Sequence, residues 1–212
     1  ASGVAASRKE RERKVTGHLN RISFFAAVIW LAGCGSSPPI HFYTLSAEAS
    51  PHPVAPVKND RPISVGPVTL PEVIERPQLV LRTSPNRVTL VEEHQWAEPL
   101  QSEIPRVLAE NLSRLLGTKQ VAVHPQSAGD HAEYRVAVDV QRFESMLGSR
   151  VSIDVLWTIR QSSRSETTFK TGRSSVEEPV ADPSYEALAA AHSRGLVRVS
   201  RDIADAIRSL HQ

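Results

Sequence analysis

The sequence predicts an α+β domain in which a mostly antiparallel sheet packs against two long amphipathic helices. Several runs alternate apolar and polar residues between turn-forming segments, which is typical of strands with one buried face. Two longer stretches repeat apolar residues every three or four positions, as helices do when they bury one side. The 212 residues are 40% hydrophobic and 23% charged, a composition typical of globular proteins.

The first of the two helices is predicted from about Glu98 to Leu116. Pro99 is tolerated in a first turn, and Gly117 follows as a natural C-cap. Pro105 lies inside this stretch and predicts either a kink or a later start. The apolar stripe of this helix is Leu100, Ile104, Leu108, Leu112 and Leu115.

The chain closes with a second, longer helix. Asp182 is a good N-cap, and Pro183 suits the first helical position. One stripe runs along the whole stretch, and a sheet of the predicted kind needs such a stripe to cover its apolar face. The stripe is Tyr185, Leu188, His192, Leu196, Val199, Ile203, Ile207 and Leu210.

Eight strands are expected. Residues 134–143, 150–160 and 166–174 alternate with period two and should form a meander. Pro67 places its strand at a sheet edge or marks a bulge near Gly66. The proline-bearing residues 47–62 should be an extended linker. The remaining expected strands are 41–45, 63–70, 78–82, 87–91 (a hairpin with 78–82) and 119–124.

The N-terminal residues have the pattern of an export signal. A basic stretch ends at Arg21, and a short apolar run follows from Ile22 to Leu31. At about 1.5 Å per residue this run covers roughly 15 Å, half of a bilayer core of about 30 Å. A positive flank, a short apolar run and small residues at a cleavage point define a secretory signal. The alternatives are an uncleaved membrane anchor and a chance match inside a hydrophobic core.

The run ends in Leu31, Ala32, Gly33 and Cys34, which resembles the bacterial lipobox. The resemblance implies cleavage before Cys34, a diacylglyceryl group on its thiol and an acyl chain such as palmitate on its new amino group. Several acyl chains make a stable anchor, at about 0.8 kcal/mol per buried CH₂. Gly35 in place of Asp favours the outer membrane, by analogy with enterobacterial sorting. We therefore expect a signal peptide over 1–33, a lipidated tether over 34–40 and one domain over 41–212.

The charge distribution argues against a nucleic-acid partner. The residues before Cys34 hold six of the 25 basic and two of the 23 acidic residues. The exported part then has 19 basic against 21 acidic residues, close to neutral. Binding to a duplex needs a clustered basic surface that displaces counterions from phosphates.

The sequence has no nucleophile elbow, phosphate-binding loop, dinucleotide fingerprint or zinc-protease motif. Its eight His are scattered, so no metal site is expected. A lone His on an apolar stripe, such as His192, is more often a satisfied core residue than a ligand. We therefore predict no catalytic residue and no cofactor beyond the lipids on Cys34.

Several segments together resemble the PqiC family. They are Pro71 to Arg82, the run Trp96-Ala-Glu-Pro-Leu100, and Phe42-Tyr-Thr-Leu45 shortly after the lipobox. Tyr134 to Phe143, Trp157 and the Tyr185–Ile207 helix match as well, so the resemblance covers nearly all of the exported part. Glu92-Glu-His-Gln95 departs from the pattern because it lacks an Arg, which leaves the charge expected there unsupported.

The resemblance implies an auxiliary lipoprotein of an MCE-type intermembrane lipid transport system. It implies a homo-oligomer, anchored in the outer membrane and facing the periplasm, that meets an MCE-domain protein and its membrane permease and supports envelope integrity. The alternatives are a structural envelope lipoprotein without a transport role and, from another class, an envelope hydrolase that would need an activated Ser or His.

The residues expected at a partner or subunit interface are Arg76, Pro77, Gln78, Arg82 and Trp96. The first three could equally form a rigid turn into the next strand, because proline stiffens a loop in either case. Trp96 is more in keeping with core packing at the start of a helix than with a ligand platform.

Overall fold

The computed structural model describes residues 38–47, 61–125, 132–163 and 166–210. The signal segment, the lipobox with Cys34 and most of the linker lie outside these ranges. The chain divides into two units, residues 1–39 and residues 40–212, and the described helices and strands belong to the second.

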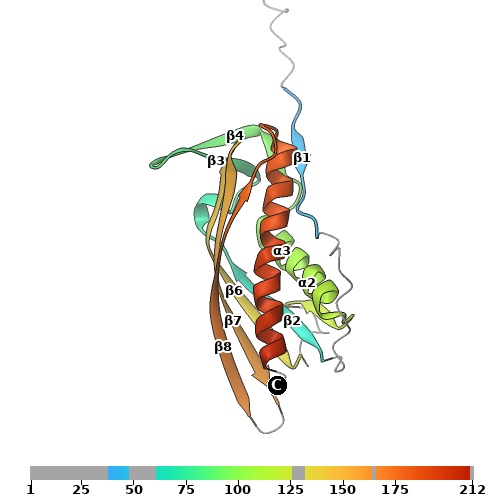
Figure 1. The fold of residues 1–212 in the computed structure, drawn as a ribbon. Coiled ribbons are helices and arrows are strands. Elements are labelled where there is room, and N and C mark those ends of the chain that lie inside the picture. Colours follow the sequence, from blue (N-terminus) through green and yellow to red (C-terminus); the bar gives the residue numbers. More distant parts are fainter. Residues whose placement is uncertain (1–37, 48–60, 126–131, 164–165, 211–212) are drawn as a thin grey trace, which may run out of the picture. The chain divides into compact units, whose positions relative to one another are not determined.

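Both helices lie on one face of a single sheet (Figure 1). This is the α+β class that the sequence predicts. A short 3-10 helix, η1 (Glu72–Ile74), follows the second strand. The described strands are β1 (His41–Tyr43), β2 (Ile63–Thr69), β3 (Gln78–Ser84), β4 (Arg87–Trp96), β5 (Val121–Val123), β6 (Tyr134–Met146), β7 (Arg150–Ser162) and β8 (Thr167–Pro179).

The sheet is mixed rather than mostly antiparallel, which corrects the sequence-based expectation. The meander β6–β7–β8 and the hairpin β3–β4 are antiparallel, as predicted. In contrast, β1 pairs in parallel with β4, β2 with both β5 and β6, and β3 with β6. Parallel pairs need long crossovers, and the connection from β2 to β6 contains a helix. Alternation within a strand shows which face is buried and carries no information about such distant partners.

β2 is an interior strand with a bulge, so of the two alternatives expected for Pro67 the structure shows the bulge and not the edge position. β2 lies between β5 and β6, and its register against β6 shifts between Val65 and Val68. Pro67 falls within that shift, where the ladder does not use its missing N–H. Gly66 has φ +122°, a value that L side chains rarely adopt.

The helices are α2 (Leu100–Leu116) and α3 (Tyr185–Ser209). α2 begins two residues later than predicted with Pro99 as its N-cap, runs through Pro105, and ends at Gly117 in the left-handed conformation. α3 is capped by Ser184, whose Oγ accepts a hydrogen bond from Ala187 N at 3.1 Å. The prediction of Asp182 as cap was wrong, because Asp182 lies two residues before Ser184 and its carboxylate accepts a hydrogen bond from Ser184 N.

The predicted stripes form the core between helices and sheet. From Leu100 to Leu115, all five stripe residues of α2 are buried. On α3, Leu188, Leu196, Ile203 and Ile207 are at most 1% exposed. Burial of each such side chain contributes about 1.5–3 kcal/mol, so the helix–sheet contact is a large contribution to stability.

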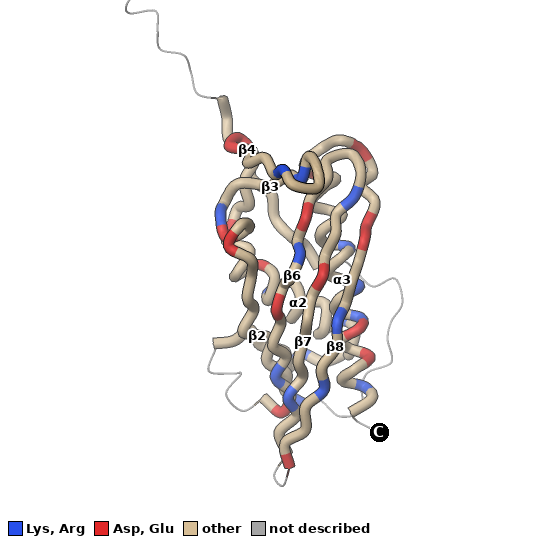
Figure 2. The backbone as a smooth tube through the Cα atoms, turned by 90° about the vertical axis from the view of Figure 1, so that its left-hand side faces the viewer, with Lys and Arg blue, Asp and Glu red and all other residues tan. Residues whose placement is uncertain are grey.

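The other face of the sheet is open and carries mixed charge (Figure 2). Arg173 of β8 forms an ion pair with Asp154 of β7 on this face. Among the described residues, no helix is both long and apolar enough to cross a bilayer.

Candidate functional site

An apolar hollow of about 580 Å³ lies where β1, the segment before β3, and the β4–α2 junction meet; we call it the Trp96 groove. Its volume falls within the range of about 300–1,000 Å³ typical of ligand sites. Carbon-rich side chains form its walls, and charged groups stand at its margin. The lining residues are Phe42, Glu75, Arg76, Pro77, Gln95, Trp96, Ala97, Glu98, Pro99, Leu100 and Gln101.

Trp96 forms the inner wall of the groove and belongs to the core. Its indole is 5% exposed and packs 6.3 Å from the Phe143 ring and 6.0 Å from the His192 ring, between centroids. Its backbone N–H donates to the carbonyl of Pro77 at 2.7 Å. This bond ties the loop before β3 to the last residue of β4, so Pro77 and Trp96 are held together in the wall of the groove.

Arg76 is half-buried at the same wall. Its Nε is shielded from solvent and has no hydrogen-bond partner among the described residues. A buried donor without a partner costs about 1–3 kcal/mol. Arg76 therefore has unused hydrogen-bonding capacity next to an apolar hollow.

Two of the five predicted interface residues lie outside the groove. Gln78 follows the lining residue Pro77 and pairs with Gln95 of β4 across the two strands. Its Nε2 donates a hydrogen bond to Glu92 at 2.9 Å. Arg82 lies farther along β3 and donates from Nη2 to Glu144 of β6 at 2.7 Å. The structure thus brings together Arg76, Pro77 and Trp96, and it separates Arg82 from them.

Phe42 is an exposed lining residue that sequence reasoning did not assign to the site. It is 62% exposed, although phenylalanine is normally buried. Its strand pairs in parallel with β4, which sets Phe42 opposite Gln95. The sequence did offer one sign of an exposed site residue, because Phe42 is a bulky apolar residue in a very short strand. The sequence does not show, however, which strand β1 pairs with.

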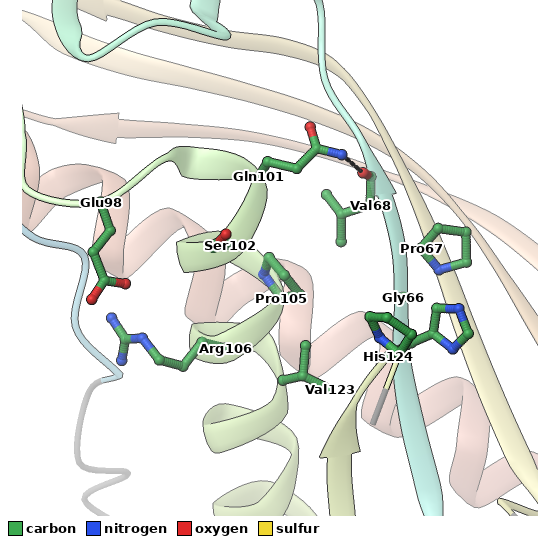
Figure 3. Close-up of a pocket in the computed structure, with 11 residues that line it drawn as sticks. Gly66, Pro67, Val68, Glu98, Gln101, Ser102, Pro105, Arg106, Val123 and His124 are labelled. Carbon is green, nitrogen blue, oxygen red and sulfur yellow. Dashed lines mark hydrogen bonds between the residues drawn. The ribbon is translucent and has the colours of Figure 1, made fainter. Parts of the chain in front are cut away.

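A second hollow, of about 560 Å³, lies on the other side of the first turn of α2. Figure 3 shows β2 and the segment after β5 on one side of it and α2 on the other. Gln101 crosses to β2 and donates from Nε2 to the Val68 carbonyl at 2.8 Å. Glu98 and Arg106 extend toward each other at the margin (Figure 3). This hollow contains no described nucleophile paired with a base.

A buried carboxylate fixes the segment after β1. Glu103 of α2 is 0% exposed, and its Oε1 accepts from the backbone N–H of Leu45 at 2.8 Å. Arg106 approaches the same oxygen at 3.4 Å and also donates to the Leu45 carbonyl. Burial raises the pKa of Glu103 despite these contacts. The carboxylate therefore holds structure in place and is enclosed from any substrate.

His192 is likewise a core residue. Its Nε2 lies 2.8 Å from Ser145 Oγ, and its ring stacks on Phe143 with centroids 4.0 Å apart. Complete burial lowers the pKa of His192 to about 3, so the ring is neutral at physiological pH. The Ser145–His192 pair is closed off from solvent, and a hydrolase nucleophile would need access to substrate.

An aromatic stack holds β1 against β4 and the start of α3. The His94 ring lies 3.7 Å from the Tyr185 ring and 5.1 Å from the His41 ring, between centroids. The Tyr43 hydroxyl lies 2.6 Å from His94 Nδ1. Burial lowers the pKa of His94, and the neighbouring His41 adds to the effect. The stack fixes Phe42 in place because Phe42 lies between His41 and Tyr43.

The described residues place the enclosed titratable groups and the accessible hollow in different parts of the domain. Within the described ranges, no three His, Cys, Asp or Glu side chains are grouped as metal ligands. The enclosed titratable groups support the fold, and the accessible hollow is mainly apolar. Such a surface is suited to contact with another macromolecule or a hydrophobic molecule.

Comparison with known proteins identifies the family of this chain. The family described as "ABC-type transport auxiliary lipoprotein component" matches residues 43–204, and the chain belongs to it. Its members are transport components, and a lipoprotein of a transport system belongs to the cell envelope.

The chain is similar to the intermembrane transport lipoprotein PqiC of Escherichia coli (strain K12) and of Shigella flexneri. In both cases it is 27% identical over 134 residues, which cover 63% of this chain and 70% of the relative. The family resemblance drawn from Pro71–Arg82 and the other segments is thereby confirmed.

Two crystal structures share the fold. One, of an uncharacterized protein, has a TM-score of 0.64 and 20% identity, covering 80% of this chain and 99% of that one. The other, protein XCC0632 from Xanthomonas campestris, has a TM-score of 0.57 and 20% identity, covering 77% and 92%.

Proposed function

We propose that this chain is a non-catalytic auxiliary lipoprotein of an MCE-type intermembrane lipid transport system. In this proposal it is anchored in the outer membrane through Cys34 and faces the periplasm. It assembles as a homo-oligomer, contacts the MCE-domain protein that works with a membrane permease, and supports envelope integrity. Family membership, together with the lipobox at residues 31–34, supports the proposal.

The Trp96 groove is the proposed contact surface, and it is the observation that favours binding of a partner over catalysis. Interfaces are enriched in aromatic residues and Arg, and their energy is concentrated where such residues border an apolar pocket. The groove combines an exposed Phe42 and an Arg76 whose Nε has no described partner. An apolar side chain of the partner or of a neighbouring subunit would fill the hollow, and a carbonyl or carboxylate would accept from Arg76.

Co-purification from membranes tests the proposal. The full-length lipoprotein should retain its cognate MCE-domain protein, and Arg76→Ala and Phe42→Ser should weaken that retention. Arg87→Ala is the matched control, because Arg87 is an exposed arginine in the β3–β4 hairpin outside the groove. The thermal midpoint of each variant verifies folding.

The results separate the proposed function from its alternative. Failure of the wild-type chain to retain the MCE-domain protein, together with a normal permeability barrier in a deletion strain, would contradict the transport role. Assembly of the chain without that partner would then favour a structural envelope lipoprotein. Equal retention by Arg76→Ala, Phe42→Ser and Arg87→Ala would exclude the groove while leaving the transport role in place.

A further inference from the structure

Exposed apolar side chains gather at the end of the domain where its chain begins. Ile40 is 50% exposed, Phe42 is 62% exposed, and Leu147 in the β6–β7 turn is 36% exposed. We call these three residues the apolar rim. Val88 and Leu90 of the β3–β4 hairpin, which projects from the same end, are exposed as well.

Contacts with the start of α3 place the rim residues at one end. The β6–β7 turn lies beside it, because a Cβ added to Gly148 would be 3.1 Å from Pro183 Cβ. β1 lies beside it too, since Tyr43 is 6.2 Å from Tyr185 between ring centroids. Ile40 and Phe42 alternate with His41 along β1 and therefore share one face.

We infer that the apolar rim contacts the lipid surface to which the chain is attached. This inference rests on the proposed lipid anchor at Cys34. Ile40 follows Cys34 by six positions, and at about 3.5 Å per position this stretch spans at most about 20 Å. The 13-residue strands β6, β7 and β8 are each about 43 Å long, so the opposite end of the domain lies beyond that reach when the strands stand upright.

Charges near this end are of both signs, so an anionic headgroup alone does not explain the contact. Arg82 forms an ion pair with Glu144 at 2.7 Å, and Arg150 pairs with Glu177 at 3.4 Å. The acidic Asp182 and Glu186 flank the beginning of α3. Burial of apolar area is therefore the driving term, and it is insensitive to screening by salt. Phe42 belongs both to the apolar rim and to the lining of the Trp96 groove.

The test uses the full lipidated chain in phospholipid vesicles. Ile40→Cys and Leu147→Cys are labelled with the fluorophore NBD, and vesicles with or without doxyl-labelled phosphatidylcholine report contact with lipid. Phe169→Cys on β8 is the matched control, because Phe169 is 63% exposed near the opposite end of the strands. NBD at 40 and 147 should lose most of its emission to the doxyl group and keep that loss at high NaCl concentration. NBD at 169 should retain its emission.

Two outcomes would overturn the inference: full emission at both rim positions, or equal quenching at all three positions. The wild-type chain is the control for the anchor, because Cys34 is its one cysteine and lipid on the thiol prevents labelling. NBD on wild-type protein would therefore show that the proposed anchor is absent, a failure distinct from that of the rim. Since the labelled positions are exposed, their substitution should leave stability within about 0.5 kcal/mol. Melting curves check this.

Discussion

The carboxylate of Glu103 accepts a hydrogen bond from the backbone amide of Leu45, 2.8 Å away and 58 positions earlier in the chain. Both residues are buried, so this bond fastens the segment that follows β1 to α2. β1 has only three residues and carries Phe42 into the groove. The position of the groove wall therefore depends on a bond within the core.

Removal of that bond should destabilise the domain. Glu103→Ala leaves the buried Leu45 amide without its acceptor, and we expect a loss of about 1–3 kcal/mol in unfolding free energy. Chemical denaturation measures the loss. Glu110→Ala is the control on the same helix, because Glu110 is partly exposed and its pair with Arg114 is a surface pair worth less than about 1 kcal/mol. Equal effects of the two substitutions would contradict this role for Glu103.

Glu103 also predicts a pH dependence. Burial raises the pKa of Glu103 above its ordinary value of 4.5, so the folded state holds this proton more tightly than the unfolded state does. The resulting stabilisation is complete below about pH 4.5 and is lost as the pH rises through the folded-state pKa. Glu103→Gln has no such proton. The stability of the wild type relative to Glu103→Gln should therefore decrease as the pH rises through this window, as pH-resolved denaturation would show; a constant difference would contradict the prediction.

His192 predicts a pH dependence of the opposite sign. Burial lowers the pKa of His192 from 6.5 to about 3, so its stabilisation is present above pH 6.5 and is lost as the pH falls toward 3. Between pH 7 and pH 5 this contribution should fall by about 2 kcal/mol, at 1.36 kcal/mol per unit. His192→Leu should remove that loss. Ser145→Ala retains the ring and should keep it, which separates the titration from the hydrogen bond. The same slope in wild type and His192→Leu would contradict this origin.

The local features of the fold were predictable from sequence, because they depend on neighbouring residues. The stripe from Leu188 to Ile207 repeats with the helical period, and the meander alternates along each strand. The mixed sheet was not predictable, since the pairing of β2 with β6 joins residues about 70 positions apart. The N-cap of α3 was misplaced because Asp182 and Ser184 both suit that role locally. Only the three-dimensional path of the chain decides between them.

The candidate site divides in the same way. Arg76, Pro77 and Trp96 were identified from the family-like segments, and the structure brings them together. Phe42 joins them only through the parallel pairing of β1 with β4, which the sequence does not contain. Arg82 ends the same family-like segment as Arg76 and Pro77, but an extended strand carries it away toward Glu144.

Gly172 is predicted to be intolerant of any side chain. It lies opposite Trp157 across β7 and β8, and a Cβ there would be 2.1 Å from the indole ring. The indole covers the glycine and donates to Ser174 Oγ at 3.1 Å, an arrangement known to offset a glycine in a strand. Gly172→Ala should displace the ring and cost about 1–3 kcal/mol, with a change in tryptophan fluorescence. Thr171→Ala on the exposed face is the control, and an unchanged Gly172→Ala protein would refute the prediction.

The stack centred on His94 should determine how firmly β1 is attached. His94→Ala removes the contacts with Tyr185 and His41 as well as the partner of the Tyr43 hydroxyl, and each aromatic contact contributes about 0.5–1.5 kcal/mol. We expect faster amide hydrogen exchange over residues 41–45 and little change in β7, because β1 is held at the margin of the sheet by this stack and by Glu103. His94→Phe keeps the stacking and loses the hydrogen bond, so its exchange should lie between that of the wild type and that of His94→Ala. Exchange over residues 41–45 that is identical in all three proteins would show that Glu103 and the backbone pairing with β4 hold β1 without the aromatic rings.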